Sequence, residues 1–224
     1  TSGIGLGIAT EFAKAGYNII FHGLESEGPI IAATIGKEYN VDTHYSSSNL
    51  LDPSEIILMI RNAVSDLGSI DVLVNNAGIQ PPIGPLYQID PLEWKHNIEV
   101  NLFGVMYWTR EVLEEMVHQR KGKIVNLAGG GATSPRSNFS AYAVAKVGVA
   151  RFTETIAQEV ARYNIEVNAV SPGAINTKML SEILAAKDLA GDEYDAAVKR
   201  EAAGGQDPEV AAELVCFLLS DRSD

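Results

Sequence analysis

Cysteine is nearly absent from the 224-residue sequence, which contains only Cys216. A single cysteine excludes an internal disulfide framework and fits a reducing compartment, so we expect a cytoplasmic protein. No stretch approaches the roughly 20 consecutive apolar residues of a membrane-spanning helix, which argues against a membrane protein. Basic side chains are also scarce, with 17 Lys and Arg against 29 Asp and Glu and a formal net charge of −12. This imbalance argues against nucleic acid or an anionic membrane as a partner.

Short apolar segments alternate with helical patterns along the whole chain. Segments rich in β-branched residues and bounded by Gly, Asn, Asp or Pro predict strands at 17–23, 41–47, 70–76, 122–128 and 165–172. Apolar spacing and Asp-Pro start signals predict helices at 4–15, 53–67, 92–120 (one helix or two), 141–163 and 207–219. The alternation predicts an α/β fold, a doubly wound parallel sheet in one domain spanning residues 1–224.

Both ends of the sequence interrupt this pattern. The chain opens with TSGIGLG, a glycine turn that leads into a helix without a strand before it. It stops at LLSDRSD, directly after a helix, where a doubly wound sheet is expected to continue with a strand. We therefore expect the first and the last strand of the sheet to be missing from this sequence.

Two turns are candidate nucleotide contacts. The glycines of residues 1–7 would let backbone N–H groups approach a pyrophosphate at the positive end of a helix, and a tight packing turn is an equally good alternative. The segment IDVLVNNAG ends a predicted strand in Asn75, Asn76, Ala77 and Gly78, at the edge where parallel sheets bind ligands. For an isolated turn of this kind, a purely structural role is the more common explanation.

A tyrosine and a lysine lie one helical turn apart in YAVAK. The side chains of Tyr142 and Lys146 reach the same face of the predicted helix. A nearby ammonium group favours the phenolate and lowers the phenol pKa from its usual value of about 10. The pair therefore suits proton exchange with an alcohol/ketone couple. Because chance gives such a spacing in roughly one sequence of three, the pair alone proves nothing.

In their order and spacing, the segments TSGIGLGIA, VNNAG, VNLFG, YAVAK and NAVSPGAINT resemble the short-chain dehydrogenase/reductase family over essentially the whole chain. The resemblance implies a Rossmann-type fold, an NAD(P)-dependent oxidoreductase that interconverts a secondary alcohol and a ketone by hydride transfer, and a homotetramer. The family's usual interface helices correspond to 92–120 and 141–163. Their large side chains are interface anchors or core residues, and the sequence does not separate the two: Phe103, Tyr107, Trp108 and Phe152.

The resemblance assigns roles to individual residues. Tyr142 matches the general acid/base, Lys146 matches the residue that binds the nicotinamide ribose and lowers the tyrosine pKa, and Asn101 matches the asparagine of a proton relay. Asn49 replaces the family's adenine-side acid and retains hydrogen-bonding capacity. No metal ligand is expected. The positions that match cofactor-binding residues are Ser2, Gly3, Ile4, Asn49, Leu50, Asn76, Ala77, Gly78, Tyr142, Lys146, Pro172, Gly173, Ile175 and Thr177.

The segment after the second predicted strand favours NAD over NADP. Residues 23–28 contain no Arg or Lys that would bind a 2′-phosphate, and Glu25 and Glu27 would repel one. The family's usual acid for the ribose hydroxyls is replaced by Gly23, and Glu25 is equally well explained as a solvated loop charge. NADP stays open, because the upstream part of the glycine loop, which can carry a phosphate-binding base, is absent from the sequence.

The substrate is constrained by partial matches to one subfamily. The N-terminal half resembles 3-hydroxybutyrate dehydrogenases, and Gln80 matches their carboxylate-binding glutamine. The second half departs from them, because Gly131, Phe139 and Ala174 replace their His, Lys and Trp. The segment 179–208 corresponds to the family's substrate lid. Its apolar face predicts an uncharged or mildly polar secondary alcohol or ketone: Met179, Leu180, Ile183 and Leu184.

The hydroxyl that holds the substrate oxygen in the family is missing. The catalytic serine corresponds to Gly129 or, in relatives with a GGGAT loop, to Ala128, and we place both positions beside the substrate. Nearby hydroxyls are candidate substitutes, although each is more simply an ordinary loop residue: Thr133, Ser134, Ser137 and Ser140. Two functions therefore stay open. The retained Tyr, Lys and Asn favour an active enzyme, and the alternative is a catalytically impaired nucleotide-binding scaffold or sensor.

Overall fold

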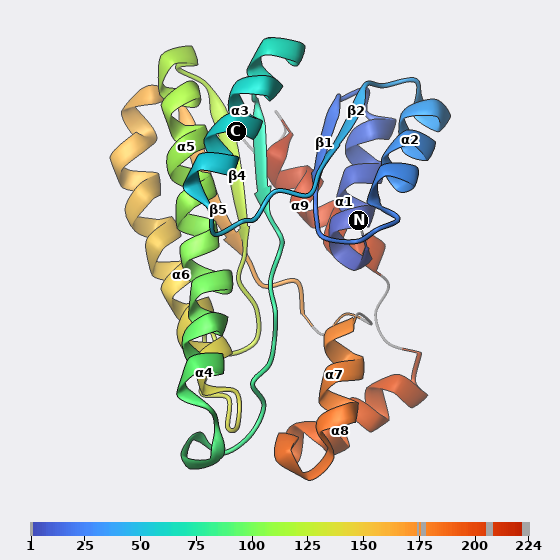
Figure 1. Ribbon diagram of the computed structural model, residues 1–224, viewed down its shortest axis with the longest axis vertical. Coiled ribbons are helices and arrows are strands. Elements are labelled where there is room, and N and C mark those ends of the chain that lie inside the picture. The colour runs from blue at the N-terminus through green and yellow to red at the C-terminus, as the bar shows by residue number, and fades with distance from the viewer. Residues whose placement is uncertain (1, 174, 176–177, 205–207, 221–224) are drawn as a thin grey trace.

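The computed structural model describes residues 2–173, 175, 178–204 and 208–220. Its strands lie inside the predicted segments and form two parallel sheets (Figure 1). In the first, β1 (Ile19–His22) pairs with β2 (Thr43–Ser46). In the second, β4 (Gly122–Leu127) lies between β3 (Val72–Asn75) and β5 (Ile165–Val170). Within the described residues no ladder joins β1 to β3, so the predicted doubly wound sheet is observed as two parallel parts.

Helices connect successive strands, as the alternating pattern predicts. The helix α3 occupies its predicted range and begins at Asp52, whose carboxylate accepts hydrogen bonds from the backbone N–H groups of Ser54 and Glu55. The sequence analysis did not predict α2, which begins at a Gly-Pro pair without a side-chain cap. The α-helices are α1 (Gly3–Lys14), α2 (Gly28–Tyr39), α3 (Pro53–Leu67), α4 (Pro91–Ile98), α5 (Gly104–Gln119), α6 (Ser140–Val160), α7 (Lys178–Ala186), α8 (Asp192–Ala202) and α9 (Pro208–Leu219).

Opposite faces of β4 belong to two different hydrophobic clusters. Ile124 packs with side chains of α3, α5 and β5, whereas Val125 and Leu127 pack with side chains of α1 and α9. This alternation follows from the two-residue period of a strand, which points successive side chains to opposite faces. Helices therefore cover both faces of the three-stranded sheet, and the carboxyl end of β4 leads directly into the loop before α6 (Figure 1).

A π-helical segment interrupts the predicted helix 92–120. The segment η2 (Glu99–Phe103) joins α4 to α5 without a break in the helical run, and it contains Asn101. A π turn adds one residue to the helix and rotates the side chains that follow, and such turns occur often at functional sites. The long helical prediction was therefore correct in extent, while the change of helical type within it was not foreseen.

The segment α7–η4–α8, with η4 spanning Lys187–Ala190, corresponds to the predicted lid. Side chains from α7 and α8 join Phe139 and Tyr142 in one hydrophobic cluster, and Leu180 and Ile183 are buried in it. The predicted apolar face of this segment thus packs against the start of α6. In the part of the chain that the structure describes, no helix has both the length and the apolar character needed to cross a membrane.

Candidate active site

The side chains of Tyr142 and Lys146 lie buried on one face of α6. Tyr142 is 5% exposed and Lys146 is 3% exposed, and the Lys146 ammonium is 5.5 Å from the centre of the Tyr142 ring. The Lys146 Nζ donates a hydrogen bond of 2.8 Å to the backbone oxygen of Leu127, the last residue of β4. The helical spacing and the strand end together place this pair at the carboxyl edge of the sheet.

Burial dominates the ionisation of both groups. Loss of water lowers the pKa of the Lys146 ammonium from 10.5 to about 8. Burial also raises the pKa of the Tyr142 phenol, while the Arg136 guanidinium lowers it and the Glu182 carboxylate raises it. The sequence predicted that the Lys146 ammonium lowers the pKa of this phenol. The structure assigns that effect to the Arg136 guanidinium, which the sequence analysis did not single out.

Asn101 is fully buried and faces the Asn76-Ala77-Gly78 turn. Its Oδ1 accepts a hydrogen bond of 3.2 Å from the Ile79 N–H, and its Nδ2 donates one of 2.8 Å to the Ile79 oxygen. A Cβ on Gly78 would lie 2.6 Å from the Asn101 Oδ1 and 3.6 Å from the Lys146 Nζ. The absence of a side chain at Gly78 therefore keeps the space between these two polar groups open.

Asn97 supports Asn101 from one helical turn earlier, and the sequence analysis did not single it out. Its Nδ2 donates to the backbone oxygens of Pro81, Gln80 and Ile79 at 2.6, 3.1 and 3.2 Å. Asn101 Nδ2 in turn donates to the Asn97 Oδ1 at 2.9 Å. The two amides thus fix the loop after β3. The spacing of four residues between them was the available signal.

The first turn of α1 and the turn after β3 form a cradle that fits a nicotinamide dinucleotide. Gly3 adopts a positive φ of 52°, which favours glycine, and it begins α1 directly after Ser2. A Cβ on Gly5 would come within 2.6 Å of the Asn76 Nδ2, so the two turns approach each other closely. A helix N-terminus with free N–H groups suits a pyrophosphate, and the small residues at 77 and 78 leave room for a ring.

The remaining predicted cofactor positions are placed as follows. Ile4 and Leu50 are partly buried and pack against hydrophobic clusters. Asn49 is exposed, and its Oδ1 accepts a hydrogen bond of 3.0 Å from the Leu51 N–H, so the side chain also stabilises the turn before α3. Pro172, Gly173 and Ile175 follow β5, at the same edge of the sheet as Leu127. Thr177, like Thr1 and Ala174, lies outside the described residues.

Gln80 is buried and bound by an arginine that the sequence analysis overlooked. In the orientation that satisfies both amide atoms, its oxygen accepts from the Arg136 Nη2 at 2.9 Å and its nitrogen donates to the Met179 oxygen at 3.0 Å. Arg136 also donates two hydrogen bonds of 2.9 Å to Glu193 on α8, and this pairing lowers the pKa of the Glu193 carboxyl. Arg136 is the basic residue of the loop that leads into α6, which was the available signal.

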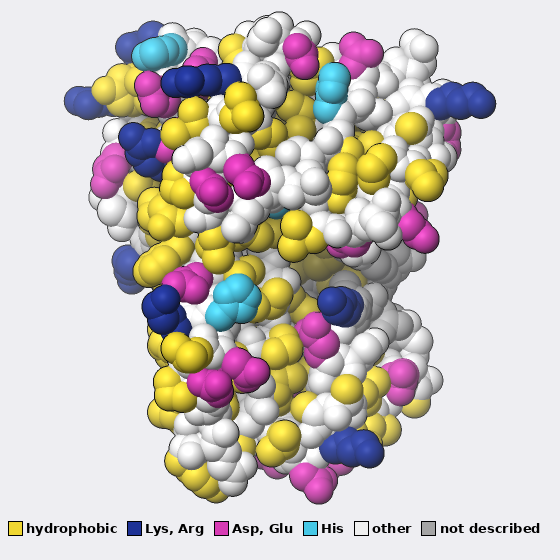
Figure 2. Space-filling model, viewed as in Figure 1, with side chains coloured by type: hydrophobic (Ala, Val, Ile, Leu, Met, Phe, Trp, Pro, Cys, Tyr) yellow, Lys and Arg dark blue, Asp and Glu magenta, His cyan; other side chains and the backbone are white. Residues whose placement is uncertain are grey.

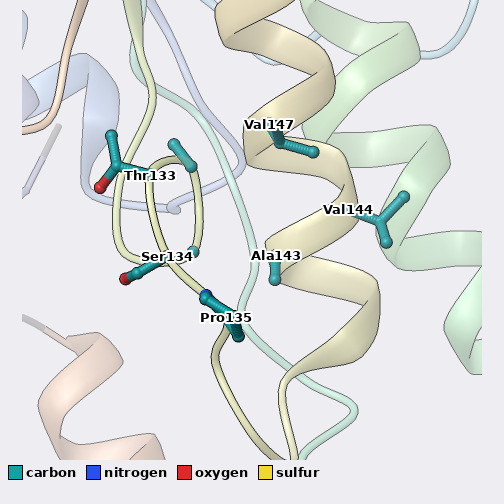
Figure 3. A pocket seen from close by; sticks show the side chains of 8 residues that line it. Thr133, Ser134, Pro135, Ala143, Val144 and Val147 are labelled. Atoms are coloured by element: carbon teal, nitrogen blue, oxygen red, sulfur yellow. The ribbon is translucent and has the colours of Figure 1, made fainter.

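The candidate hydroxyls do not replace the missing serine in the described part of the chain. The hydrogen-bond partner of the Tyr142 hydroxyl is the Met179 sulfur, at 3.9 Å. Ser140 accepts a hydrogen bond from the Trp94 indole, and Ser137 is exposed. Thr133 and Ser134 line a pocket of about 350 Å³ beside Val144 and Val147 on α6 (Figure 3).

Gly129 is the residue that faces the tyrosine hydroxyl. A Cβ built on it would lie 2.7 Å from the Tyr142 oxygen, and its φ is +146°. Ala128 is buried, and its N–H donates to the Val170 oxygen at 2.9 Å, which extends the β4–β5 ladder by one residue. The first of the two positions that the resemblance gives to the catalytic serine therefore lies beside Tyr142, and a glycine occupies it.

The site lacks the features of a metal centre in the residues described here, where no group of three or more His, Cys, Asp or Glu side chains is placed to hold an ion. Its chemistry rests on a buried phenol, the buried Lys146 ammonium, the partly buried Arg136 guanidinium and two buried amides. Such groups suit the transfer of a proton to or from an oxygen atom, with a nucleotide bound along the glycine turn.

Comparisons with known proteins point to one family. A family model described as short chain dehydrogenase matches residues 1–188. A 3-oxoacyl-(acyl-carrier-protein) reductase of Staphylococcus aureus is 34% identical over 226 residues, covering 99% of this chain and 88% of the relative. A D-beta-hydroxybutyrate dehydrogenase of Cupriavidus necator is 34% identical over 187 residues, covering 84% of this chain and 72% of the relative. The solved structure of an NAD+-bound xylitol dehydrogenase superposes with a TM-score of 0.90 at 28% identity, covering 99% and 90%.

Proposed function

The chain belongs to the short-chain dehydrogenase family, and on that premise we propose that it interconverts a secondary alcohol and a ketone with a nicotinamide dinucleotide. One observation carries the proposal. Tyr142 and Lys146 are buried on one face of α6, and the Lys146 Nζ and the Asn101 Oδ1 border the same space at Gly78. This arrangement joins a phenol to a cation and an amide at the strand edge where such folds bind nucleotides.

In the proposed mechanism, Tyr142 exchanges the proton of the substrate oxygen. During oxidation its phenolate accepts the hydroxyl proton, and during reduction its phenol donates a proton to the carbonyl oxygen. A bound nicotinamide dinucleotide supplies the hydride acceptor or donor. Lys146 binds the nucleotide ribose, and its ammonium group near the ring favours the phenolate. The Arg136 guanidinium opposes the effect of burial on the phenol pKa. Asn101 orients the loop after β3 and relays protons toward Lys146.

We propose NAD as the preferred cofactor. The loop after β1, residues 23–28, carries acidic side chains and no base that would pair with a 2′-phosphate. The Tyr45 hydroxyl lies 2.7 and 2.9 Å from the backbone oxygens of Gly23 and Glu25, which share its one proton, so this loop is held in place beside β2. One structural neighbour is an NAD+-bound xylitol dehydrogenase, which supports the same choice. A higher kcat/KM with NADP than with NAD would contradict it.

The test is formation of NADH from NAD over a panel of secondary alcohols, with Tyr142→Phe as the matched variant. We expect turnover by the natural chain and a loss of about 10²–10⁴-fold in Tyr142→Phe, because the variant keeps the ring and loses the proton acceptor. Binding of NAD should be retained by the variant. Equal turnover by both proteins would contradict the proposed role of Tyr142.

A second function is supported by Gly129. Because the residue beside the Tyr142 oxygen has no hydroxyl, a donor that would hold the substrate oxygen is lacking at that position. Loss of one such donor typically costs about 10²–10³-fold in rate. A nucleotide-binding scaffold or sensor with impaired catalysis is therefore the alternative. Binding of NAD without turnover on any alcohol or ketone would favour it.

We propose that the protein assembles as a homotetramer in the cytoplasm. The assembly is supported by exposed apolar side chains on adjoining parts of η2 and α6, where Phe103, Val144 and Val147 are 42%, 48% and 47% exposed. The location is supported by the single Cys216, a half-buried thiol whose pKa is raised to about 11 by burial, which makes it a poor nucleophile. Fractionation of cells and light scattering of the purified protein test the two statements.

A further inference from the structure

A buried oxygen atom of Glu182 lacks a hydrogen-bond partner within the residues that the structure describes. The Oε2 atom of this lid residue is inaccessible to solvent, and no donor contacts it there. An unpaired carboxylate oxygen in such a place is costly, because the atom has lost water without gaining a donor. Burial accordingly raises the pKa of the Glu182 carboxyl, and the nearby Lys178 opposes that effect. A group that brings a donor to this oxygen would relieve the cost.

Glu182 lies on the side of α7 that faces the proposed acid/base. Met179, whose sulfur contacts the Tyr142 hydroxyl at 3.9 Å, is three residues before Glu182, so both side chains share one face of the helix. The next residue, Ile183, is buried in the cluster that contains Tyr142. The charge of Glu182 also acts on Tyr142, since it raises the pKa of the phenol.

The two cations near Tyr142 already have hydrogen-bond partners. Arg136 donates to both oxygens of Glu193 and to Gln80, and Lys146 donates to the Leu127 oxygen. Gln80, the match to a carboxylate-binding glutamine, therefore has both amide atoms engaged. A substrate carboxylate would have to displace one of these pairs and would meet the negative charge of Glu182. A substrate with a hydrogen-bond donor would instead be attracted to the Glu182 carboxylate, because it supplies the donor that the buried oxygen lacks.

We propose that Glu182 selects substrates that carry a hydrogen-bond donor, a hydroxyl or an ammonium group, on the carbon next to the reacting alcohol. The inference rests on the proposed oxidoreductase function and names its substrate class. The donor bonds to the Glu182 oxygen, while the reacting oxygen lies at Tyr142. The proposal excludes carboxylates such as 3-hydroxybutyrate as preferred substrates.

The test compares kcat/KM for four probes. Butane-2,3-diol offers a neighbouring hydroxyl, 1-amino-2-propanol offers an ammonium group, 2-butanol offers neither, and 3-hydroxybutyrate offers a carboxylate. Because a hydrogen bond to a charged group is stronger than a neutral one, we expect at least one donor-bearing probe to exceed 2-butanol by about tenfold or more. The better of the two donor probes identifies whether the donor is a hydroxyl or an ammonium group.

Variants separate recognition from a structural role. In Glu182→Leu the ratio of kcat/KM between the better donor probe and 2-butanol should fall to near one. Glu182→Gln, which keeps an acceptor but loses the charge, should give an intermediate ratio. Glu201→Gln removes an exposed carboxylate from the same lid and should behave as the natural chain does. Thermal melting confirms that each variant is folded.

Four outcomes would overturn the proposal. They are a ratio that Glu182→Leu leaves unchanged, an equal loss on both alcohols in that variant, a natural preference for 3-hydroxybutyrate, and turnover of 2-butanol alone. The last of these would leave the oxidoreductase function standing. If no probe is turned over, saturation-transfer NMR of the same probes still decides it. Binding of a donor probe that is weakened in Glu182→Leu supports the Glu182 site even where the proposed reaction fails.

Discussion

Burial of the charged Lys146 side chain lowers the free energy of unfolding of the chain. Its ammonium is buried and has one hydrogen-bond partner, the Leu127 oxygen, in the described part of the structure. Its pKa is lowered to about 8, so the unfolded chain binds this proton more tightly than the folded chain does between about pH 8 and pH 10.5. In that window the free energy of unfolding rises with pH, because deprotonation removes the buried charge. Below pH 8 both states are protonated and the full cost is present.

We therefore expect Lys146→Met to lose this pH-dependent rise. Urea unfolding of the natural chain and the variant, measured from pH 7 to pH 10.5, should show that the natural chain gains up to about 3 kcal/mol relative to the variant across the window. Lys37→Met removes a positive charge from an exposed position of α2 and serves as the control. A constant difference between natural chain and Lys146→Met at every pH would refute the prediction.

Gly129 cannot simply be converted back to the family's serine. Its φ of +146° is unfavourable for any L side chain, and a Cβ there would lie 2.7 Å from the Tyr142 oxygen. We expect Gly129→Ser to lower the melting temperature, by an amount equivalent to at least about 1 kcal/mol, and to reduce activity rather than raise it. Gly129→Ala should destabilise similarly, since both add the same Cβ. A more active and equally stable Gly129→Ser protein would mean that the loop adopts another conformation.

Among individual residues, the sequence predicted those that match the family motifs, and the structure brings these residues together. Tyr142, Lys146 and Asn101 are examples, although their chemical roles stay predictions. Asn97, Arg136 and Glu182 were not predicted. For Arg136 and Glu182 the reason is that the residues on which they act, Glu193 and Tyr142, lie far along the chain. Arg136 pairs with a residue 57 positions later. Pairings of this kind are set by the packing of the lid on α6, and the local sequence does not encode them.

Among the elements, Arg136 connects the loop before α6 to the lid. The guanidinium lies 3.9 Å from the centre of the Phe139 ring, binds both oxygens of Glu193 on α8, and reaches Gln80. The fork geometry of arginine satisfies these partners simultaneously, and lysine would satisfy fewer of them. The same cation lowers the pKa of the Tyr142 phenol against burial and the charge of Glu182. The contact of α8 with this loop and the ionisation of Tyr142 therefore depend on the same cation.

We expect Arg136→Met to raise the pKa of Tyr142, because the cation that favours the phenolate is lost. The pH profile of alcohol oxidation should move to higher pH, and limited proteolysis should cut α7 and α8 faster. Arg136→Lys should loosen the lid similarly while shifting the pH profile less, since it keeps a positive charge. Arg151→Met, at an exposed position of α6, controls for the loss of charge. An unchanged pH profile in Arg136→Met would show that the phenol does not sense this cation.

The elements themselves were predicted unevenly, for identifiable reasons. Strands such as β4 were found because β-branched residues and bounding turns mark them locally. The helix α2 was missed because its apolar pattern is short and it lacks a capping side chain. The π segment around Asn101 was missed because one added residue in a helix leaves no signal in the apolar period of a single sequence. The division into two sheets is a property of strand pairing, which local patterns do not report.

At the scale of the whole molecule, charge and apolar surface act in opposite directions. The chain carries a net charge of −12, and on the face shown in Figure 2 the Lys and Arg side chains are separated by acidic and apolar ones. Such a surface keeps copies of the chain apart except where apolar side chains gather. Phe103 on η2 and Val144 and Val147 on α6 are exposed apolar side chains of two elements that contact each other. The two valines also border the pocket of Figure 3.

If this face joins subunits in the proposed tetramer, a charge placed on it should break the assembly. In Val147→Glu the new carboxylate would be buried without a partner in the contact and would add to an already negative chain, and an unpaired buried charge costs several kcal/mol. Light scattering at about micromolar concentration should show a lower mass for Val147→Glu than for the natural chain. Ile30→Glu makes the same exchange at an exposed apolar residue of α2 and should leave the mass unchanged. A natural chain that is already monomeric, or a Val147→Glu protein of unchanged mass, would remove this face from the assembly.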